Sequence, residues 1–232
     1  MAENPLLPNR RLKEMLELMR RCRKLDGGNG REAMLAATAI HLEDGDVLLA
    51  QAGDKAAAAL EPKQKKNPRV TWDAVVEPDE NVALPKVSRL ALAAAMAHGL
   101  RASGGGGVVL ALTQTGAKED GLADALAYAQ KARVPLLLAV SDATDGRAKK
   151  GSVQFNEIER LADKLSLPIF PVDGEDAVAV YRVMQECALR ARNGEGPAIL
   201  WCVMYAKSTG TMTRSQMPVA RLEKYLAVRG IR

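Results

Sequence analysis

The sequence predicts an α/β fold in which helices cover both faces of a parallel sheet. From residue 107 onward, four continuous apolar strands alternate with helices. Strands that are apolar on both sides are typical of a sheet buried between two helical layers. The chain has 232 residues, of which 47% are hydrophobic and 26% charged, a composition that favours a globular domain with a buried core. We therefore expect residues 1–232 to form a single domain.

The first part of the chain predicts mainly helix. An amphipathic helix is expected after Asn9, because apolar residues recur at three- and four-residue spacing from Leu12 to Cys22. The glycine-rich run at 27–30 ends it, since glycine readily adopts turn conformations. The segment 61–86 is rich in proline and charge and predicts a divergent surface connection. The other elements expected here are a helix at Ala33–Leu42, a strand at Val47–Ala50, a short strand at Val70–Trp72 and a helix at Val87–Ala102.

The second part predicts a regular alternation of strands and helices. Its strands lack polar residues, and the intervening segments have the length and periodicity of helices. The expected strands are Val108–Leu112, Val134–Val140, Pro168–Val172 and Ala198–Tyr205. The expected helices are Leu122–Arg133, Phe155–Leu165, Ala177–Arg192 and Val219–Val228.

The composition argues against several classes of protein. The net charge of +5 is spread along the chain and aromatic residues make up 3%, so stacking of nucleic-acid bases is poorly supported. The widely spaced cysteines Cys22, Cys187 and Cys202 are expected to be buried apolar residues in a reducing compartment. No signal peptide or membrane-length apolar run is seen. We therefore expect a cytoplasmic protein without a nucleic-acid or membrane partner.

Several short motifs occur in a familiar order. They are Met19-Arg20-Arg21, Gly30-Arg31-Glu32-Ala33, Gly45-Asp46-Val47, Gly121–Leu126, Val134–Leu138, Val172–Tyr181 and Arg190–Pro197. Together they resemble the alpha subunit of thiamine-diphosphate-dependent 2-oxo acid dehydrogenases, the decarboxylating component of the pyruvate, branched-chain and acetoin complexes. The resemblance implies the thiamine-diphosphate-binding fold, a cofactor anchored through magnesium, and association with a beta-type subunit or a second copy.

The positions that hold the cofactor in that family carry other residues here. Its metal site is a Gly-Asp-Gly turn after one strand and an Asn-Asn pair after the next. The matching positions are Gln114, Thr115 and Gly116, and then Asp142 and Ala143. A Tyr-Arg-Asp-His motif, whose arginine meets the diphosphate, corresponds to Ala52, Gly53, Asp54 and Lys55. The loop that supplies the family's catalytic histidine corresponds to Tyr205–Thr211, which has no histidine.

The resemblance therefore implies the family scaffold without its site. We expect no thiamine diphosphate or magnesium, no catalytic residues and no metal ligands, and a role as a scaffold or regulatory subunit. Whether the chain is an enzyme stays open on the sequence. In one alternative, Asp142 or Asp145 serves as a substitute ligand in an active dehydrogenase subunit. In another, the loop Lys207–Thr211, together with Lys149 and Lys150, binds a small anion or a nucleotide at the ends of the strands.

Other polar residues favour structural interpretations. By resemblance Glu32 and Glu119 are the best-placed carboxylates, and a structural role is expected for both. His41 closes a helix, where contact with the helix end is the simpler interpretation. His98 lies within the predicted helix Val87–Ala102. The glycines at 104–107 precede a strand, whereas a phosphate loop opens a helix, so they predict a turn.

Overall fold

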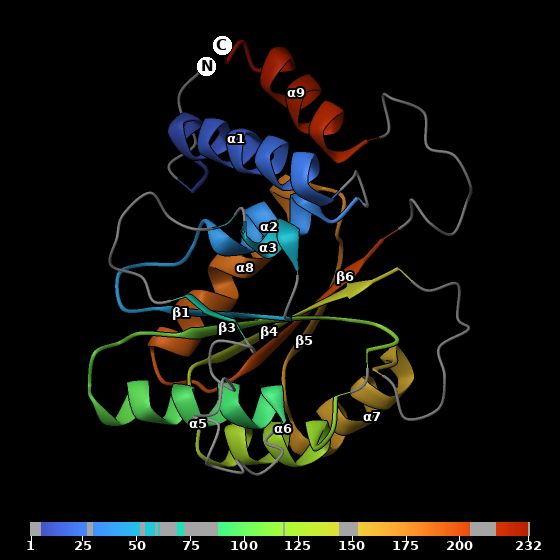
Figure 1. The fold of residues 1–232 in the computed structure, drawn as a ribbon. Helices are drawn as coiled ribbons and strands as arrows, with labels where there is room; N and C mark the ends of the chain where they lie inside the picture. Colours follow the sequence, from blue (N-terminus) through green and yellow to red (C-terminus); the bar gives the residue numbers. More distant parts are fainter. Residues whose placement is uncertain are drawn as a thin grey trace, which may run out of the picture.

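The computed structural model describes residues 6–26, 30–51, 54–58, 60, 69–71, 88–117, 119–143, 153–204 and 217–231. Within these residues one six-stranded sheet lies between two layers of helices (Figure 1), which confirms the expected fold class. The strands are β1 (Val47–Ala50), β2 (Arg69–Thr71), β3 (Val109–Gln114), β4 (Leu136–Asp142), β5 (Ile169–Asp173) and β6 (Ala198–Val203).

All paired strands of the sheet are parallel. Their order is β2-β1-β3-β4-β6-β5, so β3, β4 and β6 are flanked on both sides. These central strands are almost entirely buried, whereas β5 at one edge is half-exposed. Because the strands run in the same direction, all their carboxyl ends meet at one edge of the sheet, where ligands bind open α/β sheets.

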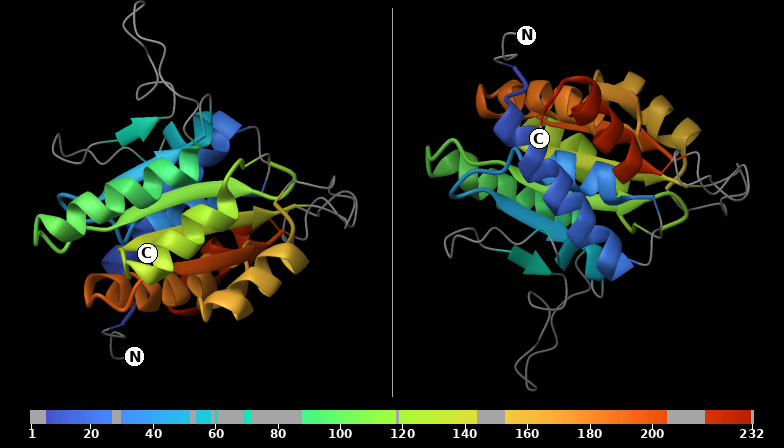
Figure 2. Two further views of the ribbon diagram at one scale, coloured as in Figure 1. Left: turned by 90° about the horizontal axis from the view of Figure 1, so that it is seen from below. Right: turned by 90° about the horizontal axis from the view of Figure 1, so that it is seen from above.

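The helices divide between the two faces of the sheet (Figures 1 and 2). One face is covered by α1 (Asn9–Asp26), α2 (Glu32–Ala39), α3 (Lys55–Ala58), α8 (Ala177–Arg192) and α9 (Pro218–Val228). The other is covered by α5 (Arg89–Ala102), α6 (Leu122–Lys131) and α7 (Phe155–Leu165). Alternate residues of β3 supply the two cores, with Leu110 and Leu112 on the first face and Val109 and Ala111 on the second. This alternation explains why the strand is apolar throughout.

Most predicted helices and strands are confirmed, but several begin or end at other residues than predicted. Strands β3 and β4 continue two residues beyond the apolar run, because Gln114 pairs with Ser141 in the ladder. The second helix ends at Ala39 rather than Leu42, and the short edge strand is Arg69–Thr71. The four-residue helix α3 (Lys55–Ala58) was not predicted. The remainder of the 61–86 connection lies outside the described residues.

A buried ion pair joins the helical layer to the edge where the strands begin. Asp46, whose side chain is 1% exposed, pairs with Arg192 at the end of α8, at 2.5 and 2.9 Å. The Asp46 carboxylate also accepts hydrogen bonds from the backbone amides of Glu43 and Val108, both at 2.8 Å. Arg192 donates further to the carbonyl oxygens of His41 and Gly106, both at 3.2 Å. One carboxylate therefore fixes the starts of β1 and β3 against α8.

His41 is part of the same junction. Its Nε2 donates to the carbonyl oxygen of Tyr181 at 2.9 Å, and the two rings pack with centroids 4.3 Å apart. Burial lowers the pKa of His41 to about 4, and the positive charges of Arg11 and Arg192 act in the same direction. The ring is therefore neutral at neutral pH. Its role is to join α2 to α8, and the expected contact with its own helix end gives way to this packing.

The three cysteines bear out the expectation that they are buried. Cys22, Cys187 and Cys202 are free thiols buried in the core. Burial raises the pKa of the Cys187 thiol to about 12 and raises that of Cys202 as well, so neither forms a reactive thiolate under ordinary conditions. No helix in the described part of the chain combines the length and apolar character needed to cross a bilayer.

We predict that Arg192→Ala lowers the free energy of unfolding by about 3 kcal/mol, because it leaves the buried Asp46 carboxylate without its counter-charge. Urea unfolding followed by circular dichroism measures the change. Arg190→Ala is the matched control, since Arg190 pairs with Glu195 at 3.0 Å on the surface, where both side chains are more than a third exposed. The control should cost less than about 1 kcal/mol. Equal losses in the two variants would contradict the central role of Asp46.

We also predict that His41→Phe flattens the pH dependence of stability below neutral pH. In the unfolded chain a histidine takes up a proton near its ordinary pKa of 6.5, whereas folded His41 does so only near 4. Between these values the unfolded state binds the extra proton, so the wild-type protein loses up to about 3 kcal/mol as the pH falls. Urea unfolding at several pH values tests this. His98→Phe, at an exposed histidine, should retain the wild-type slope.

Candidate functional site

The candidate site lies where the neighbouring strands β3 and β4 end. Thr115 follows β3 directly and is buried, whereas Gln114 at the strand end is exposed. Asp142 ends β4 and, like Ala143 after it, is half-buried. The structure thus brings together the two metal-site segments that the resemblance indicated. They meet because Gln114 and Ser141 are register partners in the parallel ladder.

The backbone amides of the turn after β3 are used within the chain. The amide of Thr115 donates to Ser141 O at 2.9 Å, and that of Ala117 donates to Gln114 O at 3.1 Å. The Gly116 amide donates to Val153 O at 3.0 Å, and the Val153 amide donates back to Ala117 O at 3.0 Å. Val153 therefore pairs with the turn like a short extra strand. Gly116 permits the turn because its φ is +80°, a conformation that favours glycine.

The Asp142 carboxylate at the end of β4 is already in contact with a neighbouring strand. Asp142 Oδ2 accepts a hydrogen bond from Trp201 Nε1 of β6 at 3.0 Å. Trp201 is 1% exposed and packs edge-on against Phe155, with ring centroids 5.1 Å apart. The Asp142 carboxylate is consequently held by a rigid indole at the strand end.

These donors match a magnesium–diphosphate anchor poorly. Magnesium prefers several oxygen ligands around an octahedron, usually including carboxylates, and a diphosphate also needs free amides or arginines. The turn offers the Thr115 hydroxyl, 3.4 Å from Ser141 O, and the neighbouring strand offers Asp142. Among the described residues no three histidine, cysteine, aspartate or glutamate side chains lie close enough together to hold a metal ion. The described residues at these strand ends therefore do not fit that group.

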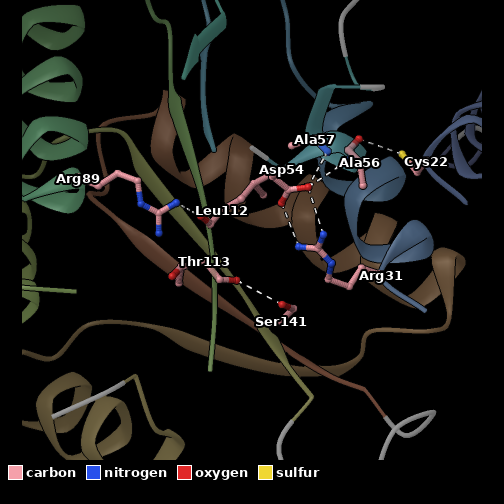
Figure 3. A network of polar contacts seen from close by, with 9 residues as sticks. All are labelled: Cys22, Arg31, Asp54, Ala56, Ala57, Arg89, Leu112, Thr113 and Ser141. Carbon is pink, nitrogen blue, oxygen red and sulfur yellow. Dashed lines mark hydrogen bonds and ion pairs between the residues drawn. The ribbon is translucent and has the colours of Figure 1, made fainter. Parts of the chain in front are cut away.

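A second part of the family motif has become a helix cap. The Asp54 carboxylate accepts hydrogen bonds from Nη1 and Nη2 of Arg31, at 3.0 and 3.1 Å (Figure 3). Its Oδ1 also accepts from the amides of Ala56 and Ala57, which begins α3. The carboxylate that the resemblance placed beside the diphosphate arginine thus has a structural role. The positions Ala52 and Gly53 themselves lie outside the described residues.

A buried ion pair between Glu119 and Arg89 lies beside β3, and the sequence had indicated only Glu119. Glu119 forms an ion pair with Arg89 at the start of α5, and Glu119 Oε1 accepts from Thr113 Oγ1 at 2.7 Å. Arg89 also donates to Leu112 O (Figure 3). A structural role for Glu119 agrees with these contacts. The role of Arg89 was missed because the sequence shows only a lone cation at the start of an apolar helix.

The other candidate residues are not brought to this site. Glu32 is 4% exposed within α2, and His41 lies at the opposite end of that helix, packed on α8. A hydrogen bond of 2.8 Å joins His98 Nδ1 to Tyr128 Oη on the exposed side of α5 and α6. The remaining candidates, Asp145, Lys149, Lys150 and the loop Lys207–Thr211, lie outside the described residues.

The motifs that carry the resemblance are mostly scaffold contacts. Asp173 at the end of β5 pairs with Arg221 of α9 at 2.8 Å. Asp176 caps α8 by accepting from the amides of Val178 and Ala179. Between them, Gly174 allows close packing, since a Cβ there would lie 2.8 Å from the Cys202 side chain. Asp46 and Arg192, from two further motifs, form the junction described above.

Comparison with known proteins identifies the family of this chain. A model of the dehydrogenase E1 component family matches residues 79–216, more than half of the chain. The alpha subunit of the pyruvate dehydrogenase E1 component from Staphylococcus epidermidis is 27% identical over 158 residues, covering 60% of this chain and 42% of that protein. The alpha subunit of acetoin:2,6-dichlorophenolindophenol oxidoreductase from Bacillus subtilis is 40% identical over 50 residues, covering 20% of this chain and 15% of that protein. The chain thus spans less than half the length of these relatives.

Solved structures show the same fold. An enzyme from Mycobacterium smegmatis assigned to the thiamin diphosphate-dependent class superposes with a TM-score of 0.54 at 15% identity, over 75% of this chain and 31% of that one. Benzoylformate decarboxylase from Polynucleobacter necessarius superposes with a TM-score of 0.54 at 11% identity, over 77% of this chain and 33% of that one. Such identities establish the fold alone, and they confirm the expected thiamine-diphosphate-binding fold.

Proposed function

Because the chain belongs to the dehydrogenase E1 component family, we propose that it is an alpha-type homologue without thiamine diphosphate or magnesium, acting as a scaffold or regulatory subunit. The family membership supports the fold and the class of partner that we propose. The altered residues at the strand ends support the loss of the cofactor. Together these observations favour a protein that keeps the assembly function of the fold without its chemistry.

The turn after β3 is the observation that carries this proposal. An anchored diphosphate needs donors that are free to reach it, whereas the amides of Thr115, Gly116 and Ala117 all donate to carbonyl oxygens of the chain. The position of the metal-binding aspartate is occupied by buried Thr115. Binding a diphosphate here would require these hydrogen bonds to break, and two of them end on carbonyl groups of the buried residues Ser141 and Val153, where a lost partner is costly.

One observation favours a second function, an active dehydrogenase subunit with substitute ligands. Asp142 places a half-buried carboxylate beside the turn, and the Trp201 hydrogen bond orients it. A single carboxylate could support a metal that kept several water ligands. This alternative needs a cofactor that binds despite the closed turn, which a titration can detect.

The outer side of α5 supports association with another subunit. This helix is apolar nearly all round, a property typical of buried helices. Yet Leu92 and Met96 are half-buried and Ala95 and Gly99 exposed along the side that faces away from the sheet. Small residues at these positions would let a second helix approach closely. We propose that this face contacts either a second copy of the chain or a beta-type dehydrogenase subunit.

We predict that calorimetric titration with thiamine diphosphate and excess magnesium gives no saturable heat, because the donors of the turn are already used. Micromolar binding would contradict the loss of the cofactor. In that case Asp142→Asn should abolish binding if Asp142 is the substitute ligand, while the amide keeps an acceptor for Trp201. Asp163→Asn, which changes an exposed carboxylate of α7, is the matched control and should bind as the wild type does.

We further predict that Ala95→Glu weakens self-association, or co-purification with a beta-type subunit, by at least about tenfold, since it would bury a charge without a partner. Sedimentation velocity and affinity co-purification measure the two outcomes. Ala227→Glu places the same change on an exposed position of α9 and should leave association intact. If both variants associate like the wild type, α5 is not the contact surface.

A further inference from the structure

The excess positive charge of the chain is concentrated on α1. This helix carries seven basic and three acidic residues, a net charge of +4, whereas the whole chain has +5. The helices on the opposite face of the sheet, α5, α6 and α7, together carry five basic and four acidic residues. The charge was expected to be spread along the chain, but one helix on one face of the sheet holds most of it (Figure 1).

Four basic side chains form a line along the outside of α1. Arg10, Lys13, Arg20 and Lys24 are all exposed, and their spacing of three, seven and four residues places them on one side of the helix. At a rise of ~1.5 Å per residue, this line is about 21 Å long. We call these four residues the basic stripe. Within the described residues, Lys13 and Lys24 take part in no hydrogen bond or ion pair.

Helix stability does not explain the arginines at the start of this stripe. The first turn of α1 contains Arg10 and Arg11 and no acidic residue, although the amino end of a helix favours negative charge. Both arginines pair with Glu14, at 2.8 and 3.2 Å. However, a cation that precedes its carboxylate along a helix has the less favourable orientation. Residues that oppose local preferences in this way are expected at functional surfaces.

The carboxylates beside the basic stripe select the kind of partner. Glu17 is exposed on the same side of α1, and Glu223 of α9 pairs with Arg20 at 2.7 Å. A lipid surface or a nucleic-acid strand presents uniform negative charge, which these carboxylates would repel. A polypeptide can instead place a neutral or basic residue opposite each of them. The basic stripe also lacks the aromatic and apolar side chains that stack on bases or enter a bilayer.

We propose that the basic stripe of α1 binds an acidic segment of another polypeptide. Carboxylates of that segment pair with Arg10, Lys13 and Lys24, while Arg20 shares its charge between the segment and Glu223. Exposed charge pairs contribute more to orientation and speed of association than to affinity, so the contact is reversible and weakened by salt. The surface lies on the opposite face of the sheet from α5 (Figures 1 and 2). It therefore goes beyond the proposed scaffold contact and does not depend on it.

The first test is a titration of a fluorescent peptide with the full chain at low ionic strength, followed by fluorescence anisotropy. The peptide is as long as α1, and its glutamates recur at three- and four-residue spacing among alanines. Saturable binding is expected, and the same peptide with glutamine in place of glutamate should bind at least about tenfold more weakly. Absence of saturation, or equal binding of the two peptides, would overturn the proposal.

Competition distinguishes the other anionic partners. Phosphatidylserine vesicles and a single-stranded oligodeoxynucleotide should displace the peptide only at a higher concentration of negative charge than the unlabelled peptide needs. Displacement at a lower concentration would assign the basic stripe to a membrane or to a nucleic acid, and would overturn its assignment to an acidic polypeptide.

Paired variants separate the basic stripe from the net charge. Lys13→Glu combined with Lys24→Glu should weaken peptide binding at least about tenfold. Lys131→Glu combined with Lys164→Glu is the matched control, because these exposed lysines lie on α6 and α7 and the net charge changes equally. The control should bind as the wild type does, and circular dichroism verifies that both variants are folded. Equal losses in the two variants would overturn the assignment to α1.

Discussion

The carboxylate of Asp46 is the point on which the arrangement of sheet and helices depends. A side chain that is 1% exposed cannot remain charged unless partners surround it. It finds them in two backbone amides and in Arg192, which reaches it from the end of α8. Because these partners come from three segments of the chain, the requirement to satisfy one charge aligns β1 with β3 and sets the position of the helix above them.

The two ends of the parallel strands have different roles. At the amino ends, residues of the family motifs make buried scaffold contacts, as Asp46 and Arg192 do. At the edge where the strands end, the positions that would anchor a cofactor carry Thr115 and Ala143, and hydrogen bonds to Ser141 and Val153 close the turn. A fold can therefore be kept when its site positions carry other residues, since folding free energy and ligand binding draw on separate residues. The apolar outer side of α5 is the surface that we propose for contact with another subunit.

Regular elements could be predicted to within a few residues because their information is local. The apolar runs at 136–140 and 198–203 and the periodicity of 155–165 and 177–192 depend only on neighbours along the chain. Much of the candidate site was also foreseen, since Thr115 and Asp142 do meet at adjacent strand ends. Helix α3 was not predicted because a segment of four residues is too short to show helical periodicity. Its cap also depends on Asp54, which is held by Arg31.

The sequence by itself determined the fold class, the order of the motifs and the identity of the residues at each cofactor position. These follow from residue type and spacing, which are properties of the chain before it folds. Only the tertiary structure decided which partners the polar groups take. Three contacts join residues that are distant in the sequence: Asp46 with Arg192, Glu119 with Arg89, and the Gly116 amide with Val153. Hydrogen bonds and buried ion pairs depend on distance in space, so the closed turn becomes visible only once the strands and helices are packed together.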